Sequence, residues 1–472
     1  MLVIWLTPAA TRDVEPQLAL IRRQLPLWTA LPFAGMLLSI ALFPLLAPSF
    51  WHHHFKKVAV AWAFVMAGPW LVQFGSLGLV VILEVLLLDY VPFLILLWGL
   101  YTVSGGILLR AKLVATPQLN VAFLCAGTVL ASLMGTTGAA MLLVRPLLRA
   151  NAWRRHRAHV LVFFIFLVAN VGGLLTPLGD PPLFLGFLHG VPFFWTLRLF
   201  PEYLFVSGTL LLVFVVIDHR LMRRELDLRP THELPHTRTS FAVVGTHNFV
   251  LLLGILGAVL LSGFWRTPSF EWFGIHVSYA NLVRDLAILA IGLVSMASTP
   301  RALRDENGFS WEPITEVAYL FFGIFVTIIP ALAILRAGAD GSLGALIVRV
   351  TEPWQYFWIS GALSSFLDNA PTYLTFMTLA LGRLGIDPGQ VGPILTGALP
   401  LPDAATFAAY LKAVSVGSVL MGANTYIGNA PNFMVLSIAK EHGVKMPSFF
   451  GYMLWSAGIL IPIFIIATLI FF

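Results

Sequence analysis

The stretch Gly172–Pro182, GGLLTPLGDPP, places an aspartate among glycines and prolines inside a long apolar run. Its pattern, G-x-x-T-x-x-G-[D/N]-x-P, returns in the other half of the chain at Gly422–Asn432, GANTYIGNAPN. The matched residues are Gly173, Thr176, Gly179, Asp180 and Pro182 in the first stretch and Gly422, Thr425, Gly428, Asn429 and Pro431 in the second. Because glycine and proline interrupt helices, the pattern predicts a broken helix at matched places in two repeated halves.

The composition is that of an integral membrane protein. Of the 472 residues, 58% are hydrophobic and 11% are charged, whereas a soluble domain carries about 25% charged residues. Apolar runs of about 20 residues predict membrane-spanning helices rather than the alternating strands of a barrel. The net charge of +6 is typical of basic cytoplasmic loops, so we expect no nucleic-acid partner. The single cysteine, Cys125, excludes an intramolecular disulfide.

Basic loops predict the topology. Arginines cluster in three loops, at residues 145–157, 218–238 and 301–304. The positive-inside rule assigns all three to the cytoplasm, and Arg110 with Lys112 assigns a fourth loop to the same side. The segment 113–144 therefore has cytoplasmic loops at both ends. Its interruption GTTG, at Gly135–Gly138, predicts a hairpin that dips into the membrane and returns.

The second half repeats this plan upside down. The stretch Ser364–Phe376, SSFLDNAPTYLTF, predicts a hairpin that enters from outside and turns at Asp368–Pro371. With five crossings and one hairpin in each half, the second half is inverted relative to the first. The N-terminus is then outside, although Arg22 and Arg23 precede the first helix. The predicted domains are an N-terminal tail at 1–26, a first repeat at 27–218, a cytoplasmic linker at 219–245 and a second repeat at 246–472. The predicted fold class is an all-α polytopic membrane protein with about ten transmembrane helices and two re-entrant hairpins.

Four breaks in these apolar segments carry the polar residues. They lie around Thr136, Thr176, Asp368 and Thr425. Non-helical backbone at membrane depth is tolerated only where protein or a water-filled cavity satisfies its polar groups. Unwound carbonyls can bind cations, while the N-termini of half-helices favour anions, so the breaks alone do not fix the sign of a transported ion.

The acidic residues favour a cation. Asp180 and Asp368 are the two acidic residues at the breaks, one from each half, and the nearest basic candidate, Lys412, lies about three turns before Gly422. A charge near the middle of a membrane costs about 3 kcal/mol or more, so it is rarely present without a function. Burial favours the protonated carboxyl, which lets a proton and a metal ion compete for it. That competition is sufficient for antiport.

The predicted ion-binding residues are Asp180, Asp368, Asn369, Thr176, Thr425, Asn424, Asn429, Thr136 and Thr137. The predicted hinge and break residues are Gly135, Gly173, Gly179, Pro182, Pro371, Gly422, Gly428 and Pro431. Each polar residue has an alternative interpretation. The two aspartates are also suited to cap helices, and the asparagines and threonines could serve only to satisfy broken backbone.

Other motifs point away from enzymatic function. The sequence contains no phosphate loop, nucleophile triad or haem motif, so we expect a gradient-driven transporter, no enzyme and no cofactor beyond Na⁺ and H⁺ as transported ions. The triplet His52–His54, beside Trp51 and two lysines, is typical of an interfacial anchor. A membrane enzyme using this triplet or Asp180 with a metal, and a passive channel, remain as alternatives.

At these motifs the chain resembles the ion transporter superfamily, which includes NhaD-type sodium/proton antiporters, arsenite permeases and citrate transporters. GGLLTPLGDPP is similar to the superfamily element GGxxTxxGDPPN, and SSFLDNAP is similar to the DN-P element of the NhaD branch. The resemblance covers most of the chain, from about Leu27 onward. Two departures, MGTTG in the first hairpin and Leu183 where the family often has asparagine, leave the ion and the substrate open.

The resemblance implies a scaffold that mediates homodimerisation and a moving transport part that holds both hairpins and both broken helices. It implies that Asp180, Asp368 and Asn369 line the ion site, with Thr176, Thr425, Asn424 and Asn429 around it. The expected function is exchange of a monovalent cation, first of all Na⁺, for protons by alternating access. The alternative is cation-coupled transport of citrate, another dicarboxylate or an oxyanion such as arsenite. The expected partners are small ions, the lipid bilayer and a second copy of the chain, and the expected location is the bacterial inner membrane.

Overall fold

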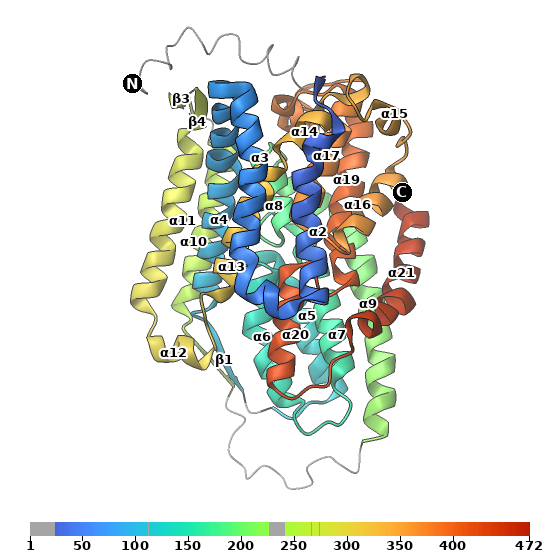
Figure 1. Ribbon diagram of the computed structural model, residues 1–472. Helices are drawn as coiled ribbons and strands as arrows, with labels where there is room; N and C mark the ends of the chain where they lie inside the picture. Colours follow the sequence, from blue (N-terminus) through green and yellow to red (C-terminus); the bar gives the residue numbers. More distant parts are fainter. Residues whose placement is uncertain (1–23, 112, 226–240, 266, 273) are drawn as a thin grey trace.

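The computed structural model describes residues 24–111, 113–225, 241–265, 267–272 and 274–472. The described chain is almost entirely helical, with two short two-stranded sheets (Figure 1). Among the described residues, nine helices are long and apolar enough to cross a membrane, or up to ten if a bent pair counts as one span. These findings confirm the predicted all-α polytopic membrane fold.

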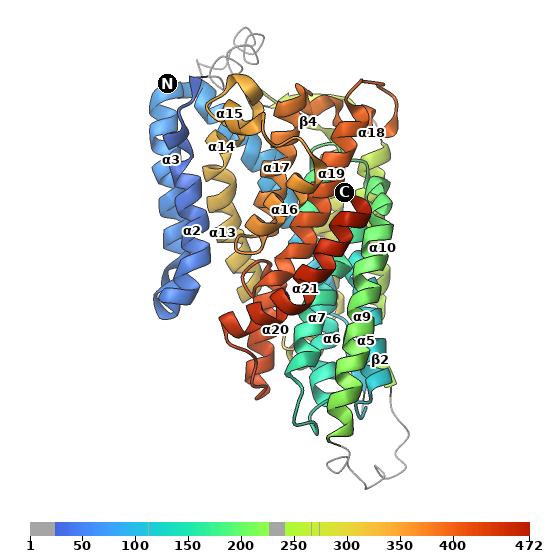
Figure 2. The ribbon, with the colours of Figure 1, turned by 90° about the vertical axis from the view of Figure 1, so that its right-hand side faces the viewer.

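The first half of the chain contains the following elements: η2 (Leu27–Ala30), α2 (Leu31–Leu46), α3 (Pro48–Glu84), the π-helical segment η3 (Val85–Tyr90), α4 (Val91–Ser104), β1 (Leu108–Ala111), α5 (Pro117–Met134), α6 (Thr136–Ala150), α7 (Ala158–Leu167), η4 (Val171–Leu175), α8 (Pro181–Leu188), η5 (Phe193–Leu199) and α9 (Phe200–Arg223). Helices α2 and α3 pack together at one side of the molecule (Figure 2). Helix α4 leads down to β1, beside the hairpin formed by α5 and α6.

The second half contains β2 (Phe241–Val244), α10 (His247–Phe264), β3 (Ser269–Trp272), β4 (Ile275–Ser278), α11 (Tyr279–Ser298), α12 (Arg301–Glu306), α13 (Glu312–Thr327), α14 (Ile329–Arg336), η7 (Gly338–Asp340), α15 (Gly344–Ile347), α16 (Pro353–Ser364), α17 (Asn369–Leu384), η8 (Pro388–Gln390), α18 (Val391–Thr396), α19 (Ala404–Met421), η9 (Gly422–Asn424), α20 (Ala430–Glu441) and α21 (Phe449–Phe471). Helices α13 and α14 meet at a bend of 42°. Pro330, in the first turn of α14, cannot donate a backbone hydrogen bond to α13, which accounts for the bend.

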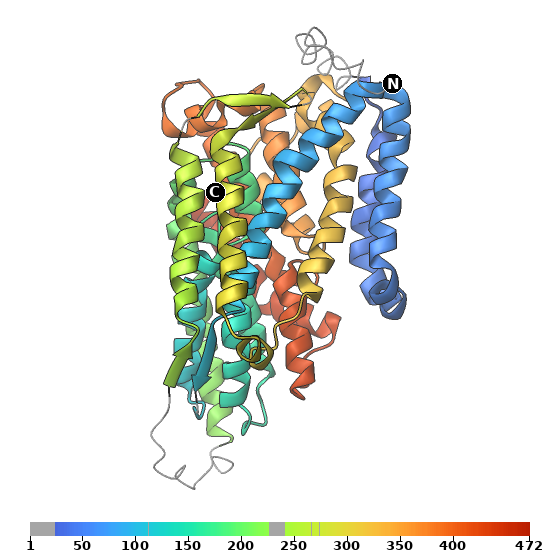
Figure 3. The same cartoon turned by 90° about the vertical axis from the view of Figure 1, so that its left-hand side faces the viewer.

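The two small sheets mark opposite ends of the molecule. Strands β1 and β2 pair antiparallel, with Leu108 opposite Val244, and join the end of α4 to the start of α10. Strands β3 and β4 lie at the other end, between α10 and α11 (Figure 3). Because the basic loops flank β1 and β2, the positive-inside rule makes that end cytoplasmic. Leu25 accepts a hydrogen bond from Ser342 near α15, so the described chain starts at the end opposite β1 and β2.

Two helical hairpins reach into the molecule from opposite ends (Figure 1). In the first, α5 and α6 lie side by side and turn at Gly135, whose φ of 80° is readily adopted by glycine. The base of this hairpin is closed by a hydrogen bond of 3.0 Å from the Ala115 N–H to the Ala150 carbonyl. The second hairpin, α16 and α17, descends from the outer end and turns just before Asn369. The repeat boundaries at 27–218 and 246–472 stay predictions.

Both broken helices depend on a close crossing of backbone. After α7 and η4 the chain turns back so that Gly179 lies against the Gly173 carbonyl, and after α19 and η9 Gly428 lies in the same way against the Gly422 carbonyl. A Cβ atom at Gly179 or Gly428 would overlap that carbonyl oxygen. Pro182 and Pro431 then occupy the first turns of α8 and α20, where a missing N–H costs nothing. The glycines and prolines of the sequence repeat therefore build two equivalent breaks.

We expect Gly179→Ala and Gly428→Ala each to lower the free energy of unfolding by about 1–3 kcal/mol, the usual cost of forcing a group into a packed interior. Thermal unfolding of the purified protein in detergent would measure the loss. Gly257→Ala, in α10, is the matched control because a Cβ atom there meets nothing within 4 Å. Equal stability of all three variants would contradict the crossing.

Candidate functional site

The side chain of Asp180 lies where both hairpins and both broken helices meet. It is 1% exposed and precedes the first turn of α8. Its Oδ1 accepts hydrogen bonds of 3.1 Å from the Thr136 hydroxyl and 3.1 Å from the Asn429 amide, and its Oδ2 accepts one from the Asn369 amide. One carboxylate is thus held by side chains from three other segments.

Each of these four residues stands at the start of a helix. Thr136 and Asn369 are the first residues of α6 and α17, and Asp180 and Asn429 are the N-caps of α8 and α20. The N-terminus of a helix carries a partial positive charge from its aligned peptide dipoles. Four such ends around one carboxylate offset part of the cost of burying its charge without a basic side chain.

A chain of asparagines connects the two broken helices behind Asp180. The Asn429 amide also donates to the Ala169 carbonyl at 3.1 Å. The Asn170 amide donates to Asn432 Oδ1 at 2.7 Å, and the Asn432 amide donates to the carbonyls of Gly422 and Thr425 at 2.8 and 2.9 Å. The sequence prediction missed Asn170, although an asparagine in an apolar run two residues before the GGLLTP stretch is a signal that could have identified it.

Asp368 lies in the same region but outside this hydrogen-bonded cluster. It is half-buried, and its Oδ1 accepts from the Ala370 N–H at 3.1 Å as the N-cap of α17. It is near enough to Asp180 for the two negative charges to repel. The structure therefore brings the two acidic residues together and also gives Asp368 the capping contact of the alternative interpretation.

The predicted threonines differ in where they point. Thr136 contacts Asp180, whereas Thr176 donates to the Ser132 carbonyl and Thr425 donates to the Ser365 carbonyl. These last two contacts come from the same position of the repeated motif, and each fastens a broken helix to a hairpin. Thr137 is half-buried, and none of the contacts found in the described part of the chain joins its side chain to Asp180.

Two buried amide oxygens have no hydrogen-bond partner among the described residues: Asn369 Oδ1 and Asn424 Oδ1. The Asn424 amide nitrogen donates to Ser365 Oγ at 2.9 Å. A buried acceptor without a donor costs about 1–3 kcal/mol, so such an atom calls for an explanation. Carboxylate and amide oxygens are the ligands that hard cations prefer. Asp180 and the free oxygen of Asn369 are therefore suited to a cation.

The basic candidate of the sequence, Lys412, is occupied elsewhere. Its ammonium pairs with the buried carboxylate of Glu202 in α9 and lies 5.6 Å from the ring centroid of Phe471. Among the described residues, every hydrogen bond to Asp180 comes from an amide or a hydroxyl. The charge of Asp180 is thus balanced by dipoles alone, which leaves it able to attract a cation.

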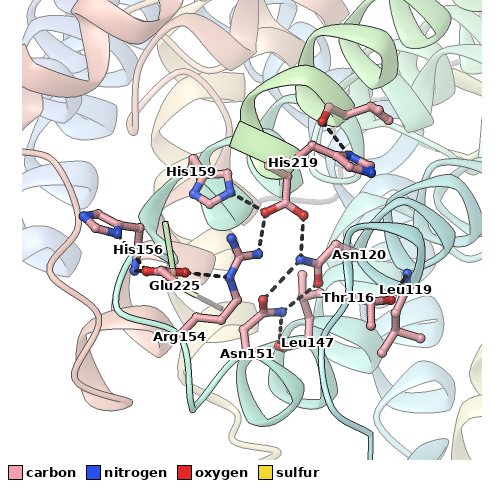
Figure 4. A network of polar contacts seen from close by, with 12 residues as sticks. Thr116, Leu119, Asn120, Leu147, Asn151, Arg154, His156, His159, His219 and Glu225 are labelled. Atoms are coloured by element: carbon pink, nitrogen blue, oxygen red, sulfur yellow. Dashed lines mark hydrogen bonds and ion pairs between the residues drawn. The ribbon is translucent and has the colours of Figure 1, made fainter. Parts of the chain in front are cut away.

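A second polar cluster fastens the cytoplasmic base of the first hairpin (Figure 4). Asp218 of α9 accepts hydrogen bonds from Arg154, from His159 Nε2 at 2.8 Å and from the Asn120 amide of α5 at 3.1 Å. Arg154 also donates to Glu225 at 3.2 Å. Burial alone would raise the pKa of Glu225, but hydrogen bonds from the His156 backbone and ring and from Arg154 lower it overall. Glu225 therefore stays ionised, and the cluster holds α5, α7 and α9 together.

We expect Asp218→Ala to lower the free energy of unfolding by about 3–5 kcal/mol, because it leaves Arg154 partly unpaired in a buried position. Denaturant unfolding in detergent would measure the change. Glu306→Ala is the matched control, since the Arg110–Glu306 pair is 52% and 38% exposed and an exposed pair contributes about 1 kcal/mol at most. The cluster would have no structural role if the two variants lost equal stability.

Broken helices with polar groups gathered at the breaks are typical of polytopic membrane transporters. A family model described as "Putative citrate transport" matches residues 22–472. The chain belongs to this family and is a multi-pass membrane transporter. The match supports a transporter family; membership of the NhaD-type branch stays a prediction.

A relative from Synechocystis sp. (strain ATCC 27184 / PCC 6803 / Kazusa), described as an uncharacterized transporter, is 28% identical over 302 residues. The aligned part is 60% of this chain and 61% of the relative. The chain thus covers less than two thirds of that protein's length.

Proposed function

We propose that the protein exchanges a monovalent cation, first of all sodium, for protons through the Asp180 site by alternating access. The observation that carries this proposal is a fully buried carboxylate that is surrounded by neutral donors and has no basic partner among the described residues. Asp180 itself occupies the point where four helix N-termini meet, so a transported anion would meet a negative charge there. A transported cation would be attracted by that negative charge.

The amide of Asn369 provides a way to accept either ion. Turning its side-chain amide by a half-rotation exchanges its nitrogen for its oxygen, a change that is easy when the oxygen has no other partner. The oxygen would then face Asp180 and complete a cation site or accept the proton of a neutral Asp180. The side-chain amide of Asn429 is less free to turn, because its nitrogen also donates a hydrogen bond to the Ala169 carbonyl.

Competition between the two ions follows from charge. Either a proton or a sodium ion neutralises Asp180, and the second ion would then find no net attraction. Hairpins that close from opposite ends bring the same carboxylate into contact with each side in turn. The site would therefore carry a proton across the membrane in one direction and a cation in the other.

The second candidate is cation-coupled transport of citrate or another carboxylate. The family description favours it, and so do the helix N-termini, which attract anions. In that case Asp180 would hold the coupling cation, and the anion would bind beside it.

Proteoliposomes with a trapped pH-sensitive dye would separate the two candidates. Sodium, lithium, potassium and citrate are added in turn to vesicles that are acidic inside. A pH change with sodium or lithium alone supports cation/proton exchange. A response to citrate alone, or to no cation, contradicts it and favours the second candidate.

A further inference from the structure

A second titratable pair lies at the other end of α8. His189, directly after the last residue of α8, places its Nε2 3.7 Å from Oδ1 of Asp89, and both side chains are 15% exposed. Asp89 belongs to η3, the π-helical segment between α3 and α4. Single turns of π-helix are rare and frequently occur at functional sites. At this exposure the pair is partly open to water, and among the described residues no hydrogen bond links it to Asp180.

The hydrogen bonds of His189 determine where a proton is needed. Nδ1 lies 2.9 Å from the Leu185 carbonyl oxygen, which can only accept, so Nδ1 carries a hydrogen. The remaining nitrogen, Nε2, faces a carboxylate, which is also an acceptor when ionised. Two lone pairs do not attract each other, so this contact is favourable only when a proton sits on Nε2 or on Asp89.

Charged and polar side chains from neighbouring segments lie close to the pair. Arg336, at the end of α14, is close enough to attract the negative charge of Asp89. Tyr373 of α17 brings its hydroxyl against Gly186 of α8, and Tyr90 of η3 donates its hydroxyl to the Ala318 carbonyl at 3.0 Å. The contact between His189 and Asp89 therefore depends on one shared proton, which either side chain can hold.

The pair joins two parts of the molecule that alternating access would separate. Helix α8 carries Asp180 before its first turn and His189 after its last, about 13.5 Å apart at 1.5 Å per residue. It packs against both η3 and α4, which lie outside the hairpins and the broken helices. Any movement of α8 relative to η3 must break the contact between His189 and Asp89.

We propose that His189 and Asp89 form a second proton-binding site, which fastens the outer end of α8 to η3 while it is protonated and releases α8 when the proton leaves. This inference rests on the proposed function only in requiring that α8 moves. The proton would come from the outer solution, through the exposed edge of the pair.

The test is the accessibility of a cysteine next to the pair. Leu188→Cys is introduced with Cys125→Ser, which removes the single native cysteine. A membrane-impermeant maleimide is applied from outside without sodium, between about pH 5.5 and pH 8.5, a range that spans histidine titration. Rates are divided by those of an exposed reference cysteine, Pro402→Cys, to remove the intrinsic pH dependence of the thiol.

We expect the normalised rate to rise at least about fivefold with pH, the lower end of usual coupling between two sites. His189→Gln and Asp89→Asn should both abolish this rise. His442→Gln is the matched control, because His442 follows α20 and places its Nδ1 2.9 Å from the Ile438 carbonyl in the same way. That variant should keep the rise.

Two results would overturn the proposal. One is a labelling rate that does not change with pH in the protein that keeps both His189 and Asp89. The other is a rise with pH that persists in His189→Gln. Because the labelling contains no sodium, it does not depend on exchange. If sodium/proton exchange fails but the labelling rate still rises with pH, the proposed function is rejected and the second proton-binding site is still supported.

Discussion

Replacing Asp180 by asparagine abolishes sodium-driven proton exchange in proteoliposomes, with an expected loss of at least about 100-fold, since even residues that only support a metal ligand contribute 10–100-fold. The reason is that the side-chain amide of an asparagine cannot bind a proton or carry a charge. The fold should survive, because the neighbours can adapt. The Thr136 hydroxyl can rotate, and the Asn369 amide can turn its free oxygen toward the new amide nitrogen.

The control for this variant is Asp387→Asn, at the outer surface, which should leave exchange unchanged. Both proteins should elute as single folded species in detergent, so that a loss of activity reports the site and not the fold. Exchange by Asp180→Asn at more than a tenth of the native rate would remove Asp180 from the ion path.

Replacing Asp368 by asparagine separates its two interpretations. We expect exchange to fall about tenfold or more, because a neighbouring negative charge at an effective dielectric of about 20 contributes about 1–4 kcal/mol to cation binding. Stability should be unchanged, since asparagine caps a helix as well as aspartate does. Initial rates of sodium-driven pH change at several sodium concentrations would measure the loss.

Asp387→Asn is also the matched control here. Asp387 accepts from the N–H two residues later, at 2.8 Å, as Asp368 does at 3.1 Å. Both are therefore N-caps, but Asp387 lies on the surface and Asp368 lies beside Asp180. If both variants exchange ions at the native rate, Asp368 is only a helix cap.

The sequence was sufficient to predict the breaks and the carboxylate at their centre. Glycine and proline at matched positions imply broken helices wherever the surrounding chain is apolar, and an aspartate at such a break must be compensated. Spacing could not predict which way the threonines point. Thr176 and Thr425 share a motif position, and both turn toward a hairpin carbonyl instead of toward Asp180.

Contacts between segments that are distant in the sequence could not be predicted either. The bond between Asn170 and Asn432 joins residues 262 positions apart, and the pair of Asp89 and His189 depends on how α8 packs against η3. Local periodicity carries no information on such pairs, because it specifies which face of a helix is apolar and not which helix it meets. The hydrogen-bonded asparagines behind Asp180 can therefore be identified only from the folded structure.

Calorimetry can determine whether the Asp180 site holds either a proton or a cation. Sodium is titrated into the purified protein in two buffers of different ionisation enthalpy, so that the heat difference counts the protons released. We expect sodium binding to release protons, and we expect Asp180→Asn to lose both the binding and the release. Sodium binding without proton release, or binding that survives in Asp180→Asn, would contradict it.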